Sequence, residues 1–173
     1  MSYSLSELNQ MSQETFTNVL ADIFEQTPSI AAKTWESRPF QSVNDLHQKM
    51  VFVMDRLSPE EQLVLRRSHP DLGSKARMAE ASVQEQKGVG LDCLSPEEFQ
   101  RFNDLNQAYR EKFGFPFLIA VKNHTKTSII EAFECRLKND SQTEQKLALR
   151  EISQIAFFRL QDIIKESSSN LTQ

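Results

Sequence analysis

Residues 95–114 read SPEEFQRFNDLNQAYREKFG. Ser95, followed by a proline and then by acidic residues, is a helix-start signal, and Gly114 is a helix-end signal. Between them the apolar side chains recur every three or four residues, which is the spacing of one helix face: Phe99, Phe102, Leu105, Tyr109 and Phe113. The stretch therefore predicts an amphipathic helix that buries one side against other helices.

Similar signals recur on both sides of this stretch. They predict further helices that begin after Ser12, Ser42, Ser58 and Ser141, and one from about Thr127 to Leu137. Helical spacing weakens in two glycine-bearing segments, 72–92 and 114–126. We expect one all-α domain over residues 1–173, a single-domain multi-helix bundle in which the two irregular segments are functional.

Composition narrows the class of protein. The chain has 173 residues and a net charge of -4 without a basic stripe, which argues against binding to nucleic acid. The longest apolar run, residues 115–121, contains Pro116 and is too short to cross a membrane. The first residues show no signal-peptide pattern, so we expect a cytoplasmic protein in which Cys93 and Cys135 are reduced and mainly structural.

The pentapeptide His69-Pro70-Asp71-Leu72-Gly73 is the first candidate for chemistry. Because proline disfavours helical geometry in the residue before it, His69 should end the helix that begins after Ser58. The negative end of a helix favours a protonated imidazole, which could act as an acid or a base. From these five residues alone, a structural role in which the ring hydrogen-bonds a helix carbonyl is the better interpretation.

Two further stretches could bind a small molecule. Residues 82–86, SVQEQ, place several polar side chains before a glycine-containing loop, although on their own a solvated helix end explains them better. Residues 114–121 are apolar and broken by Pro116, so their peptide groups cannot all pair within a helix. Some of those groups could face a ligand, and a buried connector without function is about as good an interpretation.

Other kinds of site lack their sequence patterns. His47, His69 and His124 do not have metal-ligand spacing, and neither His-Glu-x-x-His nor Cys-x-x-Cys occurs. No glycine-rich phosphate loop is present either. We expect no metal site, an exposed His47 on a helix and a His124 that lies in a loop.

Taken together and in this order, the three stretches resemble the 2-oxo-4-hydroxy-4-carboxy-5-ureidoimidazoline (OHCU) decarboxylases. His69-Pro70-Asp71-Leu72 resembles the family's His-Pro-[Asp/Glu]-Leu signature, and Ser82-x-x-Glu85-Gln86 with Gly90-Leu91 resembles its second block. The most diagnostic stretch is Asn106-x-x-Tyr109-x-x-Lys112-Phe113-Gly114-Phe115-Pro116-Phe117. The likeness spans nearly the whole chain and continues in Ile130-x-x-Phe133-x-x-Arg136-Leu137-x-Asn139-Asp140 and Glu151-Ile152-x-x-Ile155-x-x-x-Arg159-Leu160.

Two features depart from the family pattern. The connection from Gly73 to Ser82 is shorter than is usual, which bears on the geometry of that loop. Cys135 stands at a commonly basic position, but it touches no expected site.

The resemblance implies a reaction in which OHCU becomes (S)-allantoin and carbon dioxide, the third step of urate degradation to allantoin. The departing carboxylate is bound to a carbon next to a ring C=N, and this conjugated system can accept the electron pair that is left behind. The electron sink is therefore in the substrate, and no cofactor is implied. The resemblance also implies a homodimer.

Site roles follow from the same resemblance. His69 is the expected catalytic proton donor, and Glu85 holds either His69 or the substrate hydroxyl. Ser82 and Gln86 bind polar ring or ureido atoms, while Arg159 offers a planar cation to the carboxylate or to a carbonyl. The whole expected substrate-binding set comprises Pro70, Ser82, Val83, Gln84, Glu85, Gln86, Phe117, Leu118, Ile119, Ala120, Val121 and Arg159.

A helical binding module without activity and a DNA-binding helical protein are the alternatives. The presence of His69, Glu85 and Arg159 together argues against the first, because a site that no longer works need not keep them. The negative net charge and the lack of a basic recognition helix argue against the second.

Overall fold

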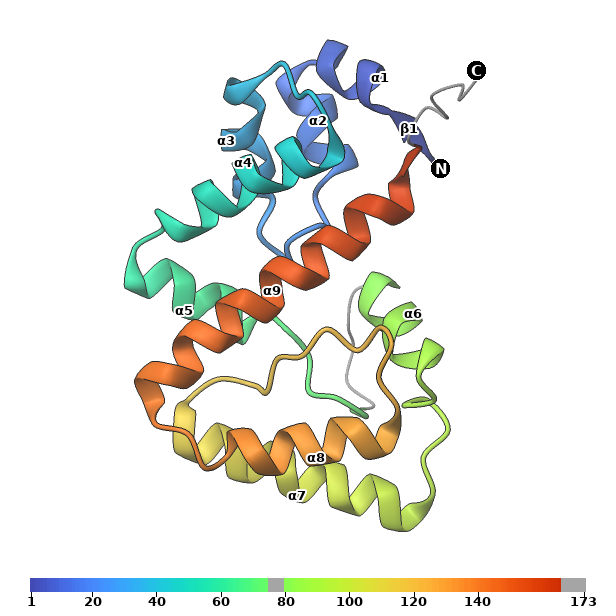
Figure 1. Ribbon diagram of the computed structural model, residues 1–173, viewed down its shortest axis with the longest axis vertical. Helices are drawn as coiled ribbons and strands as arrows, with labels where there is room; N and C mark the ends of the chain where they lie inside the picture. Colours follow the sequence, from blue (N-terminus) through green and yellow to red (C-terminus); the bar gives the residue numbers. More distant parts are fainter. Residues whose placement is uncertain (75–79, 166–173) are drawn as a thin grey trace, which may run out of the picture. The chain divides into compact units, whose positions relative to one another are not determined.

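The computed structural model describes residues 1–74 and 80–165 of the chain (Figure 1). The regular secondary structure of that part is helical apart from a short parallel ladder, in which β1 (Tyr3–Ser4) pairs with β2 (Ile164–Lys165). The predicted all-α class is thus confirmed. The chain divides into two compact units: unit 1 comprises residues 1–58 and the chain from residue 155 on, and unit 2 comprises residues 59–154. The expectation of a single domain over residues 1–173 stays a prediction.

Unit 1 contains the first helices of the chain and the end of the last one. Ser12 and Ser42 cap two of these helices as predicted, because each hydroxyl accepts a hydrogen bond from the backbone N–H three residues on. The helices of residues 5–10, 28–34 and 35–37 were not predicted, since each is too short for repeated helical spacing. The elements are α1 (Leu5–Gln10), α2 (Gln13–Val19), α3 (Pro28–Thr34), the 3-10 helix η1 (Trp35–Ser37), α4 (Val43–Asp55) and the end of α9 (Ser141–Ile163).

The helix after Ser12 is shorter than its apolar spacing predicts. α2 ends at Val19, and Gln26 has a backbone φ of 49°, which a right-handed helix does not accommodate. Ile23 and Phe24 are nevertheless buried, with 4% and 1% of their surface exposed. The spacing therefore predicted the burial of these side chains correctly and their conformation wrongly.

Unit 2 carries most of the expected site residues. Ser95 and Glu98 form a reciprocal cap at the start of α7, and Gly114 ends that helix with a left-handed φ of 80°, as predicted. Figure 1 shows α7 and α8 side by side, joined by the irregular segment 114–125. The helices of unit 2 are α5 (Pro59–Arg67), α6 (Glu80–Gly88), α7 (Pro96–Phe113), α8 (Lys126–Arg136) and the first part of α9.

The segment 72–92 is less irregular than expected, because residues 80–88 form α6. The buried side chains Ser82 and Gln86 of this helix are polar, so hydrophobic spacing could not reveal it. The expected shortening between Gly73 and Ser82 falls mostly on residues 75–79, which lie outside the described residues.

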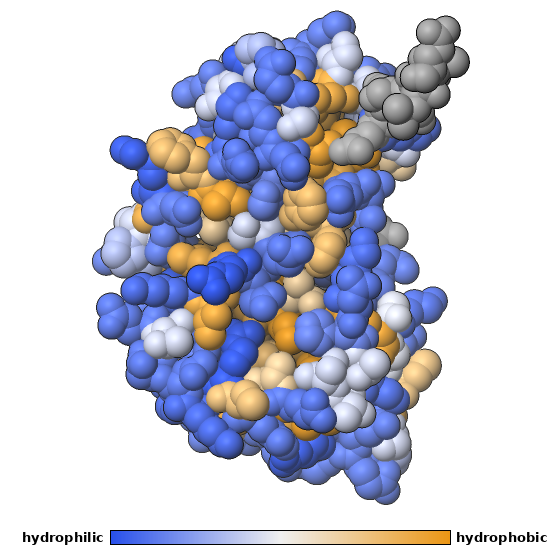
Figure 2. All heavy atoms as spheres, viewed as in Figure 1, coloured by the Kyte–Doolittle hydropathy of each residue, from blue (hydrophilic) through white to orange (hydrophobic). Residues whose placement is uncertain are grey.

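Hydrophilic side chains predominate on the face that Figure 2 shows. Within the described ranges, no helix combines the length and the apolar character that crossing a membrane requires. Cys93 and Cys135 are free and exposed, so the expected structural role in packing is wrong for both. His47 is half-buried, with its ring 5.1 Å from that of Phe157, rather than exposed.

Candidate active site

His69 lies just beyond the end of α5, where Pro70 prevents the helix from continuing. Its side chain is buried, with 6% exposed, and Nδ1 lies 3.0 Å from the carbonyl oxygen of Leu65. Because a carbonyl oxygen only accepts hydrogen bonds, this contact places a proton on Nδ1, and acid–base chemistry then belongs to Nε2. Nδ1 of His69 thus makes the hydrogen bond to a helix carbonyl that the structural interpretation expected. A catalytic role for Nε2 is compatible with that bond.

Gln86 ties α6 to the chain that follows His69. Its Oε1 accepts a hydrogen bond from the backbone N–H of Gly73 at 3.0 Å, and its Nε2 donates to the carbonyl oxygen of Asp71 at 3.5 Å. Gly73 has a φ of 70°, and a Cβ at this position would lie 2.8 Å from Cδ1 of Leu94. Only glycine fits this turn without strain, so the loop has one well-defined path.

The five predicted residues of α6 are placed differently by the structure. Ser82 and Gln86 are one turn apart and both buried, so they share the inward face of the helix. Glu85 is half-buried beside that face. Val83 and Gln84 are exposed, and their part in substrate binding stays a prediction.

A second helix, α7, holds the same loop from another side. Asn106 donates from Nδ2 to the carbonyl oxygen of Leu72 at 2.9 Å, and its side chain is buried. Nε of Arg110 lies 2.9 Å from Oδ1 of Asp71 in a partly exposed ion pair. The residues directly after His69 are thus anchored to both α6 and α7. These contacts restrict the position of the backbone that carries the imidazole.

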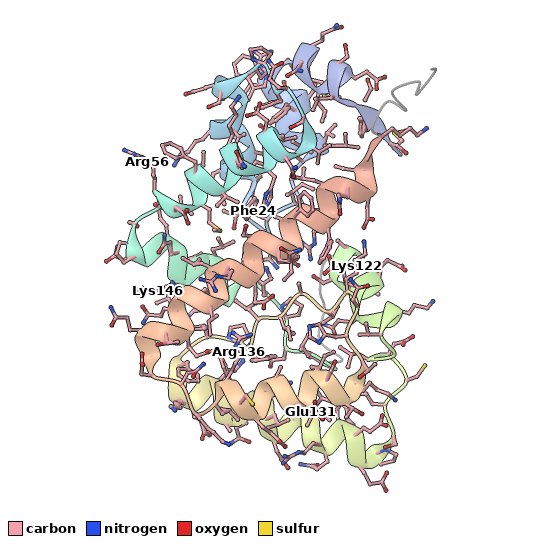
Figure 3. All side chains as sticks on the ribbon, viewed as in Figure 1. Phe24, Arg56, Lys122, Glu131, Arg136 and Lys146 are labelled. Atoms are coloured by element: carbon pink, nitrogen blue, oxygen red, sulfur yellow. The ribbon has the colours of Figure 1, made fainter. Side chains whose placement is uncertain are left out.

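Residues 117–121 are all buried, and two of their peptide groups bond to side chains. The carbonyl oxygen of Leu118 accepts from Nη1 of Arg136 at 2.6 Å, and the N–H of Ala120 donates to Oε2 of Glu151 at 3.0 Å. Figure 3 labels Arg136, which comes from α8. Side chains of α8 and α9 therefore hold this irregular segment, and the Ala120 N–H is already used within the protein.

Glu144 is the centre of a buried polar cluster that the sequence did not predict. Its side chain is fully buried, and Oε1 accepts from the Tyr109 hydroxyl at 2.6 Å and from Nε of Arg136 at 2.8 Å. Oε2 accepts from Nδ2 of Asn139 at 3.0 Å. Burial and the neighbouring Glu144 carboxylate raise the pKa of Tyr109 well above its usual range. Tyr109 stands in one motif of the family resemblance and Arg136 and Asn139 stand in another, whereas Glu144 stands in neither.

Aromatic rings complete the support of the segment. The rings of Phe117 and Phe133 stack with centroids 3.7 Å apart, and Tyr109 and Phe117 form a T-shaped pair with centroids 5.3 Å apart. Cζ of Arg136 lies 4.4 Å from the centroid of the Phe117 ring. The guanidinium that binds the Leu118 carbonyl is thus positioned by a carboxylate and by an aromatic face.

Arg159 belongs to unit 1. Its Nη1 donates to the carbonyl oxygen of Asp22 at 2.8 Å and to Oε2 of Glu25 at 2.9 Å, and both charged side chains are buried. The sequence did not predict this partner. The expected role of Arg159 in binding the substrate stays a prediction.

Among the described residues, no group of three or more histidine, cysteine, aspartate or glutamate side chains could hold a metal ion. The polar groups buried in unit 2 include an imidazole, amides, a carboxylate and guanidinium groups, which are types of group that suit the binding and protonation of a polar organic molecule.

Comparisons with known proteins agree over most of the chain. Residues 9–161 match the profile of the OHCU decarboxylases. A 2-oxo-4-hydroxy-4-carboxy-5-ureidoimidazoline decarboxylase of Halalkalicoccus jeotgali is 39% identical over 160 residues, which cover 92% of this chain and 91% of the relative. A uric acid degradation bifunctional protein of Bacillus subtilis, PucL, is 44% identical over 164 residues, or 95% of this chain.

The coverage of the relatives differs. This chain spans only 33% of the Bacillus bifunctional protein, but nearly all of the Halalkalicoccus enzyme. A crystal structure of (S)-allantoin synthase superposes with a TM-score of 0.75 at 27% identity, covering 94% of this chain and 54% of that one. The profile match and the identity along nearly the whole chain place this protein in the OHCU decarboxylase family.

Proposed function

We propose that this protein converts OHCU into (S)-allantoin and carbon dioxide without a cofactor. The bond to the carboxylate carbon breaks, its electron pair moves into the adjoining ring C=N system, and one proton is then added to one face of the ring. The observation that carries the proposal is His69, a buried imidazole whose Nδ1 is held by the Leu65 carbonyl oxygen, within a chain that matches the family over residues 9–161.

In this proposal His69 acts as the imidazolium, with a proton on each ring nitrogen, and supplies the proton from Nε2. The Leu65 carbonyl holds the ring by its other nitrogen, and Gln86 holds the loop that follows, so the imidazole needs little reorganisation before it reacts. Glu85, half-buried on the same helix as Gln86, orients either the imidazole or the substrate hydroxyl.

Substrate binding falls to Ser82, Gln86 and residues 117–121. The segment presents buried apolar side chains and peptide groups, and a poorly solvated carboxylate loses carbon dioxide more readily than a hydrated one. Since the Ala120 N–H already bonds to Glu151, the ring is bound by other peptide groups of this segment.

A homodimer in the cytoplasm is part of the same proposal. The family resemblance supports the dimer, and the free, exposed Cys93 and Cys135 suit a reducing compartment. Light scattering of the purified protein tests the dimer directly, because a mass equal to one chain would exclude it.

The activity is tested by making OHCU in solution from urate with urate oxidase and hydroxyisourate hydrolase, and then adding this protein. We expect optical activity from one allantoin enantiomer to appear faster than in the same mixture without the protein. An unchanged rate, with binding of allantoin detected by calorimetry, would support a binding module instead of an enzyme.

A further inference from the structure

Arg66 is a buried cation that the proposed reaction does not yet use. It lies in the last turn of α5, and its carbonyl oxygen is 3.5 Å from the backbone nitrogen of His69. Only 6% of its surface is exposed, and its Nε is buried without a hydrogen-bond partner among the residues that the structure describes. Among the residues whose side chains are described, no carboxylate lies within ion-pair distance of it.

The contrast with Arg136 shows what Arg66 lacks. Both guanidinium groups lie over rings of the same short stretch: Arg66 is 5.3 Å from the Phe115 centroid, and Arg136 is 4.4 Å from that of Phe117. Arg136 also forms an ion pair with Glu144. Arg66 has an aromatic contact but no carboxylate partner among the described side chains, and burial lowers its pKa because the charged form is poorly solvated.

An aromatic face compensates only part of the cost of burying a cation. This buried cation stands three residues before His69 in the sequence, and it lies over the ring of Phe115, which directly precedes Pro116 and residues 117–121. A ligand that brings a negative charge would supply the missing partner. We propose that Arg66 binds the carboxylate of the substrate, and that it distinguishes the charged substrate from the uncharged product; this inference rests on the proposed function.

The kinetic consequence follows from the reaction itself. The carboxylate is present in the bound substrate and disappears as carbon dioxide forms, so an ion pair with it stabilises the ground state more than the transition state. Loss of Arg66 should therefore raise KM by about 10- to 100-fold, the range for a hydrogen bond to a charged group, without lowering kcat. The product lacks this group and should be released as easily as before.

Binding of two probes tests the inference without any turnover. Calorimetry measures the binding of hydantoin, which has no carboxylate, and of hydantoin-5-acetate, which carries one on the same ring. Both probes are titrated into the wild type, Arg66→Met and Arg66→Lys. We expect the wild type and Arg66→Lys to prefer the carboxylate probe, and Arg66→Met to lose that preference. Arg101→Met removes an exposed arginine, ion-paired with Glu134, and should keep the preference.

Thermal unfolding without ligand supplies the second readout. Removing an uncompensated buried charge should leave the melting temperature of Arg66→Met equal to or above that of the wild type. The inference is overturned if the wild type shows no preference for the carboxylate probe, if Arg66→Met keeps it, or if Arg66→Met melts lower with its preference intact. An inactive wild type that still prefers the carboxylate would refute the proposed reaction and leave the anion site standing.

Discussion

Tyr109→Phe removes one hydroxyl from the buried cluster around Glu144 and leaves the ring in place. That hydroxyl donates to Oε1 of Glu144 at 2.6 Å, while Arg136 and Asn139 remain bonded to the carboxylate. The loss should therefore be that of a single hydrogen bond to a charged group, about 1.5–3 kcal/mol of the free energy of unfolding. For a chain of this length the melting temperature should fall by roughly 3–12 °C.

The difference in stability between Tyr109→Phe and the wild type should also depend on pH. The pKa of Tyr109 is raised in the folded protein by burial and by Glu144, whereas in the unfolded chain it is near its ordinary value of about 10. The contribution of this bond is thus complete below about pH 10, and above it the wild type loses up to about 1.4 kcal/mol per pH unit. Phenylalanine has no proton to lose, so the stability gap between the two proteins should narrow at alkaline pH.

Urea titrations followed by far-UV circular dichroism, from about pH 8 to about pH 11, measure this gap across the unfolded-state pKa of tyrosine. Tyr3→Phe, at a partly exposed tyrosine, serves as the matched control and should behave like the wild type. Equal stability of Tyr109→Phe and the wild type, or a gap that stays constant over this pH range, would refute the account of the cluster.

The remaining predictions concern the loop and the acid of the site. Gly73→Ala should cost about 1–3 kcal/mol, because its φ of 70° disfavours a side chain and its Cβ would meet Leu94; a urea titration that shows no loss would exclude this strain. Gly88→Ala, where no atom lies within 4 Å of the added Cβ, should be neutral or up to about 1 kcal/mol stabilising, and serves as its control. Glu85→Gln should lower kcat less than His69→Ala does if it only orients; equal losses in the optical assay would mean that Glu85 transfers the proton itself.

Helix starts could be predicted because their signals are local. Ser42 and Ser95 cap the helices that follow them through bonds to backbone three residues away, and Gly114 ends α7 in the conformation that glycine favours. The end of the helix before Pro70 could also be predicted from a local signal, and His69 was correctly placed at a helix end.

The parts that could not be predicted depend on distant partners or on polar burial. Of α6 only a helix end at residues 82–86 was predicted, because its inward side chains, Ser82 and Gln86, are polar and carry no hydrophobic period. Glu144 lies 35 residues from Tyr109, so its role as a shared acceptor has no local signal. Among the described residues, the absence of a carboxylate within ion-pair distance of Arg66 is likewise a property of the packed unit and not of the neighbouring sequence.

Activity of His69→Ala is the most direct test of the central claim, that an imidazole held at the end of α5 delivers the proton. With OHCU made in solution, we expect kcat to fall by about 10²–10⁴-fold while far-UV helicity persists. His124→Ala removes a half-buried loop histidine of the same unit and should retain the wild-type rate. Wild-type formation of (S)-allantoin by folded His69→Ala would contradict the account.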